Sequence, residues 1–300
     1  MLLKDFLNEG VARLESLYPT KEARNIMLML CESRIDTKSY THIVEPEYQV
    51  KDKSLEGLGA DLNRLAAGEP VQYVIGFADF CGLRFKVTPD VLIPRPETEL
   101  LCREAIKIGS RMQRMRKAYG KSAKPVRVLD LCTGSGCIAW TVALNIPGAE
   151  VTGVDISEKA VAVASSQDFA AKIKESGASA PKFVVADVLA GNQTFTEGDY
   201  DLILSNPPYI MESQKSQMRV NVLNYEPSTA LFVEDSDPLV FYRSIAVLSR
   251  TCLSAEGKGL TEINELLGPE TQKVFSEAGF QKIDLVKDFY DKNRFVFYSK

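Results

Sequence analysis

The chain has 300 residues, of which 45% are hydrophobic and 25% are charged, the composition of an ordinary globular protein. No apolar run is long enough for a membrane span, and charges at Lys4, Asp5 and Glu9 argue against a secretory signal. The net charge of −4 disfavours a general nucleic-acid binder, and the single histidine disfavours a multi-histidine metal site or a histidine-dependent triad. The six cysteines form no CxxC pair, so we expect reduced thiols and a cytoplasmic protein.

The first seventy residues are expected to form a small helical domain. Apolar residues recur at helical spacing in residues 2–18, and the segments 21–35 and 55–68 repeat this pattern. Gly68 followed by Pro70 is a typical helix stop signal. Residues 1–70 carry no catalytic constellation.

Residues 71–90 are expected to form a β-hairpin that links two domains, since aromatic and polar residues alternate around two glycines. The sequence VLIPRPETEL then places Pro96 and two acids at the start of a helix that we expect to end near Ala118. Between residues 105 and 129 there is no acid, which indicates either a solvated helix face that runs into a linker or a contact with an anionic partner. The basic residues of this stretch are Lys107, Arg111, Arg114, Arg116, Lys117, Lys121, Lys124 and Arg127.

From residue 126 onward, short apolar runs alternate with segments of helical length. The runs are residues 126–131, 149–156, 182–188, 200–206, 257–264, 282–289 and 294–300. This alternation predicts an α/β fold with a parallel, doubly wound sheet that helices cover on both faces. We expect residues 91–300 to form this domain and to bind ligands beyond the carboxyl ends of the strands.

The run VLDLCTGSGCIA, which starts at Val128, is typical of a strand, a glycine-rich turn and a helix. Gly134 and Gly136 allow the backbone to approach a ligand closely, next to the free N–H groups of a helix N-terminus. Asp155, at the end of the next strand, is well placed to bind two ribose hydroxyls. Asp187 ends the third strand, where it could read the edge of a purine.

The glycines alone leave two alternatives open, a nicotinamide-dependent dehydrogenase and a tight turn without a ligand. Asp130 and Thr133 precede the glycines and suit an amino-acid head group better than a pyrophosphate. No basic residue lies near the loop to balance two phosphates. These observations favour S-adenosylmethionine.

The stretch SNPPYI follows the fourth strand and predicts a rigid corner, because proline has a fixed φ and no N–H group. The side-chain oxygen of Asn206 and the carbonyl oxygen of Pro207 are two acceptors that can fix both N–H bonds of a planar amine. Tyr209 offers an aromatic face to the same group. Such a clamp would align a weakly nucleophilic –NH2 group about 3 Å from an electrophilic methyl group. A plain turn is the alternative interpretation.

The combination of DLCTGSG, GVDIS, NPPYI and the tract of residues 69–99 closely resembles the glutamine-N5 methyltransferases of the HemK/PrmC type. The segments YEPSTALF and LTEINELLG resemble further parts of this family, and the resemblance runs from about residue 69 to the C-terminus. It implies a Rossmann-like class I methyltransferase sheet with a small all-α N-terminal domain, residues 1–70, that would dock the protein substrate. These enzymes methylate the Gly-Gly-Gln glutamine of class 1 peptide chain release factors, so S-adenosylmethionine is the implied cofactor and a release factor the implied partner.

The resemblance also implies roles for individual residues. The implied cofactor-binding residues are Asp130, Cys132, Thr133, Gly134, Ser135, Gly136, Asp155, Ile156, Asp187, Val188, Asn206 and Arg95. The implied catalytic residues are Asn206, Pro207, Pro208 and Tyr209, which line the substrate slot together with Glu97 and Thr98. Cys132 stands where many relatives have glycine, which we expect to be tolerated if its φ is negative. Val188 lacks an aromatic face for adenine.

Two other substrates are compatible with the same chemistry. A ribosomal-protein glutamine methyltransferase is poorly distinguished by the sequence. An adenine-N6 methyltransferase of DNA or RNA would use the same clamp on a flipped base, but the acidic charge balance and the small N-terminal domain count against it. We expect a monomer that binds no nucleic acid directly and holds no metal.

Overall fold

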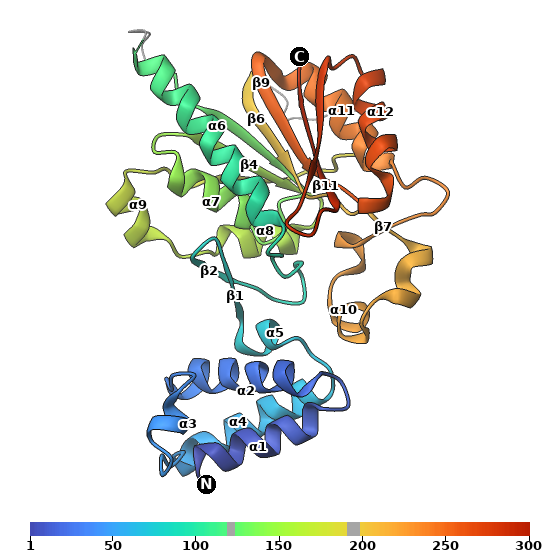
Figure 1. Cartoon of the computed structure of the whole chain (residues 1–300). Helices are drawn as coiled ribbons and strands as arrows, with labels where there is room; N and C mark the ends of the chain where they lie inside the picture. The colour runs from blue at the N-terminus through green and yellow to red at the C-terminus, as the bar shows by residue number, and fades with distance from the viewer. Residues whose placement is uncertain (119–123, 191–198) are drawn as a thin grey trace. The chain divides into compact units, whose positions relative to one another are not determined.

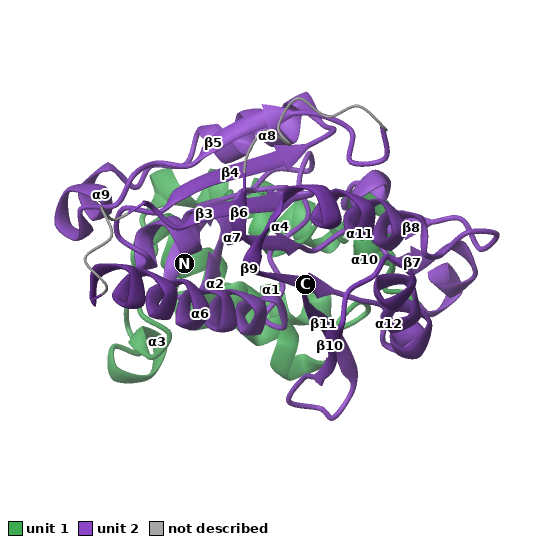
Figure 2. Ribbon diagram, turned by 90° about the horizontal axis from the view of Figure 1, so that it is seen from above, with its two compact units in different colours: residues 1–77, 218–225 green, residues 78–217, 226–300 purple. Residues whose placement is uncertain are grey.

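The computed structural model (Figure 1) describes residues 1–118, 124–190 and 199–300. Contacts divide the chain into two compact units (Figure 2). The first unit comprises Met1–Phe77 with Met218–Tyr225, and the second comprises Ala78–Gln217 with Glu226–Lys300. In the described parts of the chain, every helix is too short or too polar to cross a bilayer.

The first unit is helical, as predicted for its N-terminal part. Its helices are α1 (Leu3–Leu14), α2 (Thr20–Ile35), α3 (Thr41–Val44), α4 (Asp52–Ala66), α5 (Val71–Ile75) and α10 (Val220–Tyr225). The apolar stripes of α1, α2 and α4 meet in one core around Leu7, Met27 and Leu62, which are fully buried. α10 comes from a distant part of the sequence and is held to this unit by a hydrogen bond from the Tyr225 hydroxyl to the Ala67 carbonyl oxygen, 2.9 Å long.

Residues 71–90 differ from the predicted hairpin in their first part. Val71–Ile75 form α5 instead of a strand, and only β1 (Phe77–Phe80) and β2 (Leu83–Lys86) pair as a hairpin. Pro70 precedes the helix, where a proline is well tolerated, and Gly76 ends it with a φ of 87°. Val71, Tyr73, Val74 and Ile75 are buried on this short helix, although they begin the alternating pattern that predicted a strand.

The second unit is built on a seven-stranded sheet, and all seven predicted strands are present. Its order is β10-β11-β9-β6-β3-β4-β5. The bounds are β3 (Arg127–Leu131), β4 (Glu150–Asp155), β5 (Lys182–Val185), β6 (Tyr200–Ser205), β9 (Leu253–Glu262), β10 (Lys282–Lys287) and β11 (Asn293–Ser299). β5, β4, β3, β6 and β9 are parallel to one another, as expected. β11 is antiparallel to both neighbours, and the short turn that joins it to β10 requires this orientation of that pair.

Helices cover both faces of this sheet, and β6 shows why the layers form. Leu202 and Leu204 point into a core with the helices α6 (Thr98–Ala118) and α7 (Cys137–Asn145). Ile203 points into a second core with α11 (Val240–Cys252) and α12 (Gly268–Glu277) on the other face. Tyr200 joins the same core, because the register of the strand shifts between Tyr200 and Leu202. The other helices, α8 (Glu158–Ser165) and α9 (Ala170–Ser176), follow β4, and the short strands β7 (Ile210–Met211) and β8 (Phe232–Val233) pair separately.

One member of the basic stretch has an internal role. Arg116 binds the buried carboxylate of Asp201 through both terminal nitrogens, with an Nη1–Oδ2 distance of 2.9 Å. The backbone N–H of Arg127 donates to the same carboxylate. Arg116 therefore anchors the end of α6 to the sheet. Lys121 lies outside the described residues.

Candidate active site

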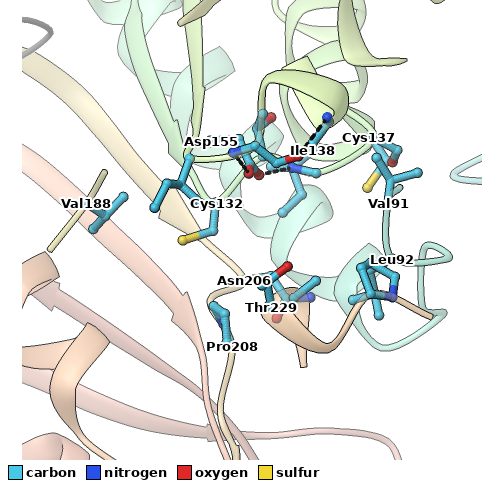
Figure 3. A pocket seen from close by; sticks show the side chains of 18 of the residues that line it. Val91, Leu92, Cys132, Cys137, Ile138, Asp155, Val188, Asn206, Pro208 and Thr229 are labelled. Atoms are coloured by element: carbon cyan, nitrogen blue, oxygen red, sulfur yellow. Dashed lines mark hydrogen bonds between the residues drawn. The ribbon is translucent and has the colours of Figure 1, made fainter. Parts of the chain in front are cut away.

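A pocket of about 360 Å³ lies beyond the carboxyl ends of the parallel strands β3, β4, β5 and β6, where ligands were predicted to bind (Figure 3). Each strand contributes the residues that follow it. Cys132 to Ser135 follow β3, Asp155 ends β4 and is followed by Ile156 and Ser157, and Asp187 to Leu189 follow β5. Asn206 and Pro208 follow β6, and in Figure 3 they lie below Asp155.

The glycine-rich loop brings its backbone to the pocket. Gly134 has a φ of 55°, and the space into which a β-carbon would project is open. Gly136 has a φ of 78° and caps α7. Cys132 has a φ of 61°, so the negative φ on which we made the tolerance of a cysteine at this position conditional is not found. A left-handed conformation costs a residue with a β-carbon about 1–2 kcal/mol, so the loop imposes this conformation on Cys132.

The carboxylate of Asp155 is fixed by the backbone on both sides. The N–H of Gly134 donates to Oδ2 at 2.8 Å, and the N–H of Ser157 donates to Oδ1 at 3.0 Å. Burial raises the pKa of Asp155, and these two hydrogen bonds oppose that shift. Because each oxygen has a second lone pair, the carboxylate can still accept hydroxyl groups of a ligand.

Asp130 lies behind the loop and does not line the pocket. Its Oδ2 accepts hydrogen bonds from Thr133 Oγ1 (2.6 Å) and from the N–H of Ala139 (3.2 Å). Its Oδ1 is buried and has no partner among the described residues. Burial raises the pKa of Asp130 to about 7, against the effect of the two hydrogen bonds. A buried acceptor without a donor is costly, and a nearby positive charge would relieve that cost.

The corner after β6 presents an amide oxygen to the pocket. Asn206 donates from Nδ2 to Thr98 Oγ1 over 3.2 Å, and in the described chain no hydrogen bond reaches its Oδ1. Tyr209 does not line the pocket: its hydroxyl donates to Glu262 Oε1 at 3.0 Å, and its carbonyl oxygen accepts from Asn264 Nδ2 at 2.9 Å. Burial raises the pKa of Tyr209 well above its usual value, so the hydroxyl stays protonated.

Most of the predicted site residues meet at this pocket. Those that line it are Arg95, Thr98, Cys132, Thr133, Gly134, Ser135, Asp155, Ile156, Asp187, Val188, Asn206 and Pro208. Those that do not are Glu97, Asp130, Gly136, Pro207 and Tyr209. Their roles toward a ligand stay predictions. For Arg95 the structure adds a competing partner, because its guanidinium pairs with the buried carboxylate of Glu226 at 2.6 Å.

Several lining residues were not predicted. Pro227, Thr229 and Phe232 come from the YEPSTALF segment, which the sequence resemblance had marked without assigning a role. Phe241 of α11 also lines the pocket and provides an aromatic side chain, which Val188 does not. No local sequence signal marks Phe241, because only the packing of α11 on the sheet brings it there.

The residues present fit S-adenosylmethionine. The open backbone at Gly134 leaves room for the close approach of a ligand, Asp155 can accept ribose hydroxyls, and the buried Oδ1 of Asp130 suits a nearby ammonium group. Phe232, Phe241 and Val188 give the pocket the apolar wall that a purine requires.

Comparisons with known proteins agree with this geometry. Residues 5–76 match the PrmC N-terminal domain, and residues 99–231 match the methyltransferase small domain. A release factor glutamine methyltransferase of Flavobacterium psychrophilum is 35% identical over 296 residues, which cover 99% of this chain and 98% of that relative. A release factor glutamine methyltransferase of Bacteroides thetaiotaomicron is 35% identical over 288 residues, which cover 94% of this chain and 95% of the relative.

A solved structure shares the fold. The catalytic domain of hMettl16 in complex with a hairpin of the MAT2A 3′UTR has a TM-score of 0.52 and is 13% identical. The match covers 83% of this chain and 81% of that one. With the fold, the pocket and the relatives taken together, this chain is an S-adenosylmethionine-dependent methyltransferase and belongs to the family of the release factor glutamine methyltransferases.

Proposed function

We propose that the protein transfers a methyl group from S-adenosylmethionine to the side-chain amide nitrogen, N5, of the glutamine in the Gly-Gly-Gln motif of class 1 peptide chain release factors, and so modulates translation termination. The two relatives that match over nearly their full length are release factor glutamine methyltransferases, which supports this substrate. The observation that carries the proposal is the Asn206 carboxamide, whose nitrogen is bound by Thr98 and whose oxygen is left for a ligand at the pocket wall.

The residues of the corner would act on the glutamine amide in a simple way. The bound cofactor supplies an electrophilic methyl group on a sulfonium. An amide nitrogen is a poor nucleophile because its lone pair is delocalised into the carbonyl group. If Asn206 Oδ1 and the carbonyl oxygen of Pro207 each accept one N–H, the two hydrogen bonds fix the orientation of the –NH2 group. Its lone pair then points at the methyl group, and orientation of this kind is a large part of catalysis. Transfer would leave the cofactor as its thioether, and the amide nitrogen would release one N–H proton to solvent.

The proposed substrate also gives each part of the chain a role. We propose that residues 1–70 form the docking domain for the release factor, that residues 71–90 link it to the catalytic domain of residues 91–300, and that the enzyme works in the cytoplasm as a monomer. The net charge of −4 favours a protein partner over direct nucleic-acid binding.

A methyl-transfer assay tests the proposal. The protein is incubated with methyl-labelled S-adenosylmethionine and either a class 1 release factor or its Gly-Gly-Gln→Gly-Gly-Ala variant, with ribosomal proteins and duplex DNA in parallel reactions. Label should enter only the intact release factor, and peptide mass spectrometry should place it on the glutamine. Equal labelling of both release factors would exclude the glutamine assignment, and labelling of DNA or of ribosomal protein would identify a different substrate.

A further inference from the structure

The end of β9 carries a buried carboxylate whose residue is not among the predicted site residues. Glu262 is 1% exposed and is the last residue of β9. It accepts two hydrogen bonds from hydroxyl groups, one from Thr98 Oγ1 to Oε2 (2.6 Å) and one from the Tyr209 hydroxyl to Oε1 (3.0 Å). β6 and β9 are paired so that Ser205 lies opposite Thr261, which brings the next residues of both strands, Asn206 and Glu262, to the same edge of the sheet.

These contacts form a chain in which the direction of each hydrogen bond is determined. An ionised carboxylate can only accept, so Thr98 must spend its one hydroxyl hydrogen on Glu262. Toward Asn206, the Thr98 oxygen can then only accept, and only the –NH2 end of the carboxamide can face it. The other end of the carboxamide is the oxygen Oδ1. The carboxylate of Glu262 therefore sets which end of Asn206 is left for the pocket.

The surroundings of Glu262 bear on its charge. Burial raises the pKa of Glu262, while the bonds from Thr98 and Tyr209 and the positive charge of Arg294 oppose that shift. Glu97 is the other charged group that acts on it, and it acts in the same direction as burial. Arg294 is itself held in place by the carboxylate of Asp288 at 3.0 Å. The fixed positive charge of Arg294 thus favours the ionised form of Glu262. The direction of the hydrogen bonds from Thr98 and Asn206 depends on that form.

We propose that Glu262 and Thr98 are positioning residues that hold the Asn206 carboxamide with its oxygen toward the methyl acceptor. This inference rests on the proposed function, and it sharpens the specificity of the site. An oxygen presented in this way binds a group that carries N–H donors, such as the –NH2 of glutamine. Glutamate has nearly the same shape, but its carboxylate would place an acceptor against an acceptor.

Four variants separate this role from general stability. Thr98→Val keeps the shape but removes the hydroxyl, and it should lower kcat for release-factor methylation by at least about tenfold with little change in cofactor Kd. Thr98→Ser restores the hydroxyl and should restore most of kcat. Glu262→Gln should lower kcat less, because its one carbonyl oxygen can serve Thr98 or Tyr209 but not both. In the double variant, the loss should equal that of Thr98→Val alone, since both changes break the same chain.

A matched control is Asp201→Asn, which removes another buried carboxylate, the one bound by Arg116 at the opposite end of β6. It should lower thermal stability but leave kcat at saturating cofactor nearly unchanged. The positioning role is refuted if Thr98→Val retains kcat within twofold, if the effects of Thr98→Val and Glu262→Gln multiply, or if Asp201→Asn loses as much kcat as Glu262→Gln.

A second measurement does not depend on which substrate is methylated. In protein labelled with ¹⁵N-asparagine, the side-chain –NH2 signal of Asn206, assigned with Asn206→Asp, should contain one proton that exchanges slowly with water because it is bound by Thr98. Thr98→Val and Glu262→Gln should make that exchange at least about tenfold faster, and Asp201→Asn should not. If release factors are not methylated but this exchange pattern is found, the proposed substrate fails and the positioning role stands. Unchanged exchange in Thr98→Val would overturn the positioning role itself.

Discussion

S-adenosylmethionine should bind more tightly as the pH rises from about 5.5 to about 7, because Asp130 must lose a proton to accompany the positive charge of the ligand. In the ligand-free protein, burial raises the pKa of Asp130 to about 7, so this carboxyl group is largely protonated at the lower pH. A nearby ammonium group favours the ionised form and lowers the pKa. Binding therefore releases a proton, and affinity must rise with pH.

The size of the effect follows from the raised pKa. If only the ionised form binds well, the apparent Kd is multiplied by one plus the ratio of protonated to ionised Asp130. With a pKa near 7 that factor is roughly 30 at pH 5.5 and roughly 2 at pH 7, so the affinity should increase roughly 15-fold. The predicted increase applies only up to about pH 7, because at higher pH the α-amino group of the ligand begins to lose its own proton.

Isothermal titration calorimetry across this range measures the effect, and two buffers with different ionisation enthalpies count the protons released. Burial also raises the pKa of Asp155, which contributes in the same direction. The control is therefore Asp130→Asn, which keeps the shape and the bonds from Thr133 and Ala139 but cannot titrate. Its affinity should depend far less on pH. Equal pH dependence in both proteins, or weaker binding at the higher pH, would refute the assignment of Asp130 to the cofactor site.

Three further predictions concern the site and its frame. Asn206→Ala should abolish turnover while cofactor Kd, measured by calorimetry, stays within about tenfold, because the clamp acts mainly in the transition state. Gly153→Ala should lower the free energy of unfolding by about 1–3 kcal/mol, measured by Trp140 fluorescence in urea, since its β-carbon would lie 2.7 Å from the Phe183 ring. At the left-handed φ of Cys132, the same measurement should show Cys132→Gly as stable as the wild type or up to about 1 kcal/mol more stable, and Cys132→Val clearly less stable.

The parts of the fold that follow local rules were predictable. The central strands of the sheet were found because they bury residues on both faces and so form nearly continuous apolar runs, as Arg127–Leu131 and Tyr200–Ser205 do. The lining residues after β3, β4 and β6 were found because ligands bind where parallel strands end. Local rules failed where the surrounding structure overrides the preference of the residues themselves. Val71–Ile75 has β-branched and aromatic residues yet forms a helix between Pro70 and Gly76, and the left-handed Cys132 is imposed by the tight turn around it.

The contacts that orient the catalytic corner could not be predicted, because they join three segments that are far apart in the sequence. Thr98 begins α6, Asn206 follows β6 and Glu262 ends β9, so that 164 residues separate Thr98 from its acceptor. A buried glutamate in an apolar strand gives no indication of its partner. Only the pairing of β6 with β9 and the packing of α6 on both place its carboxylate beside the corner.

Stability alone does not account for that carboxylate. Removing an ionised carboxylate from water costs several kcal/mol even after the protein relaxes, and an apolar residue of similar size is often as stable or more stable at such a position. The two hydroxyl hydrogen bonds, each worth about 1.5–3 kcal/mol to a charged acceptor, offset part of that cost. A serine, threonine or glutamine at residue 262 could also bind Thr98, but each can donate as well as accept and would leave the direction of the bond undetermined. What the carboxylate of Glu262 adds is a single direction of hydrogen bonding, and the orientation of the Asn206 carboxamide depends on it.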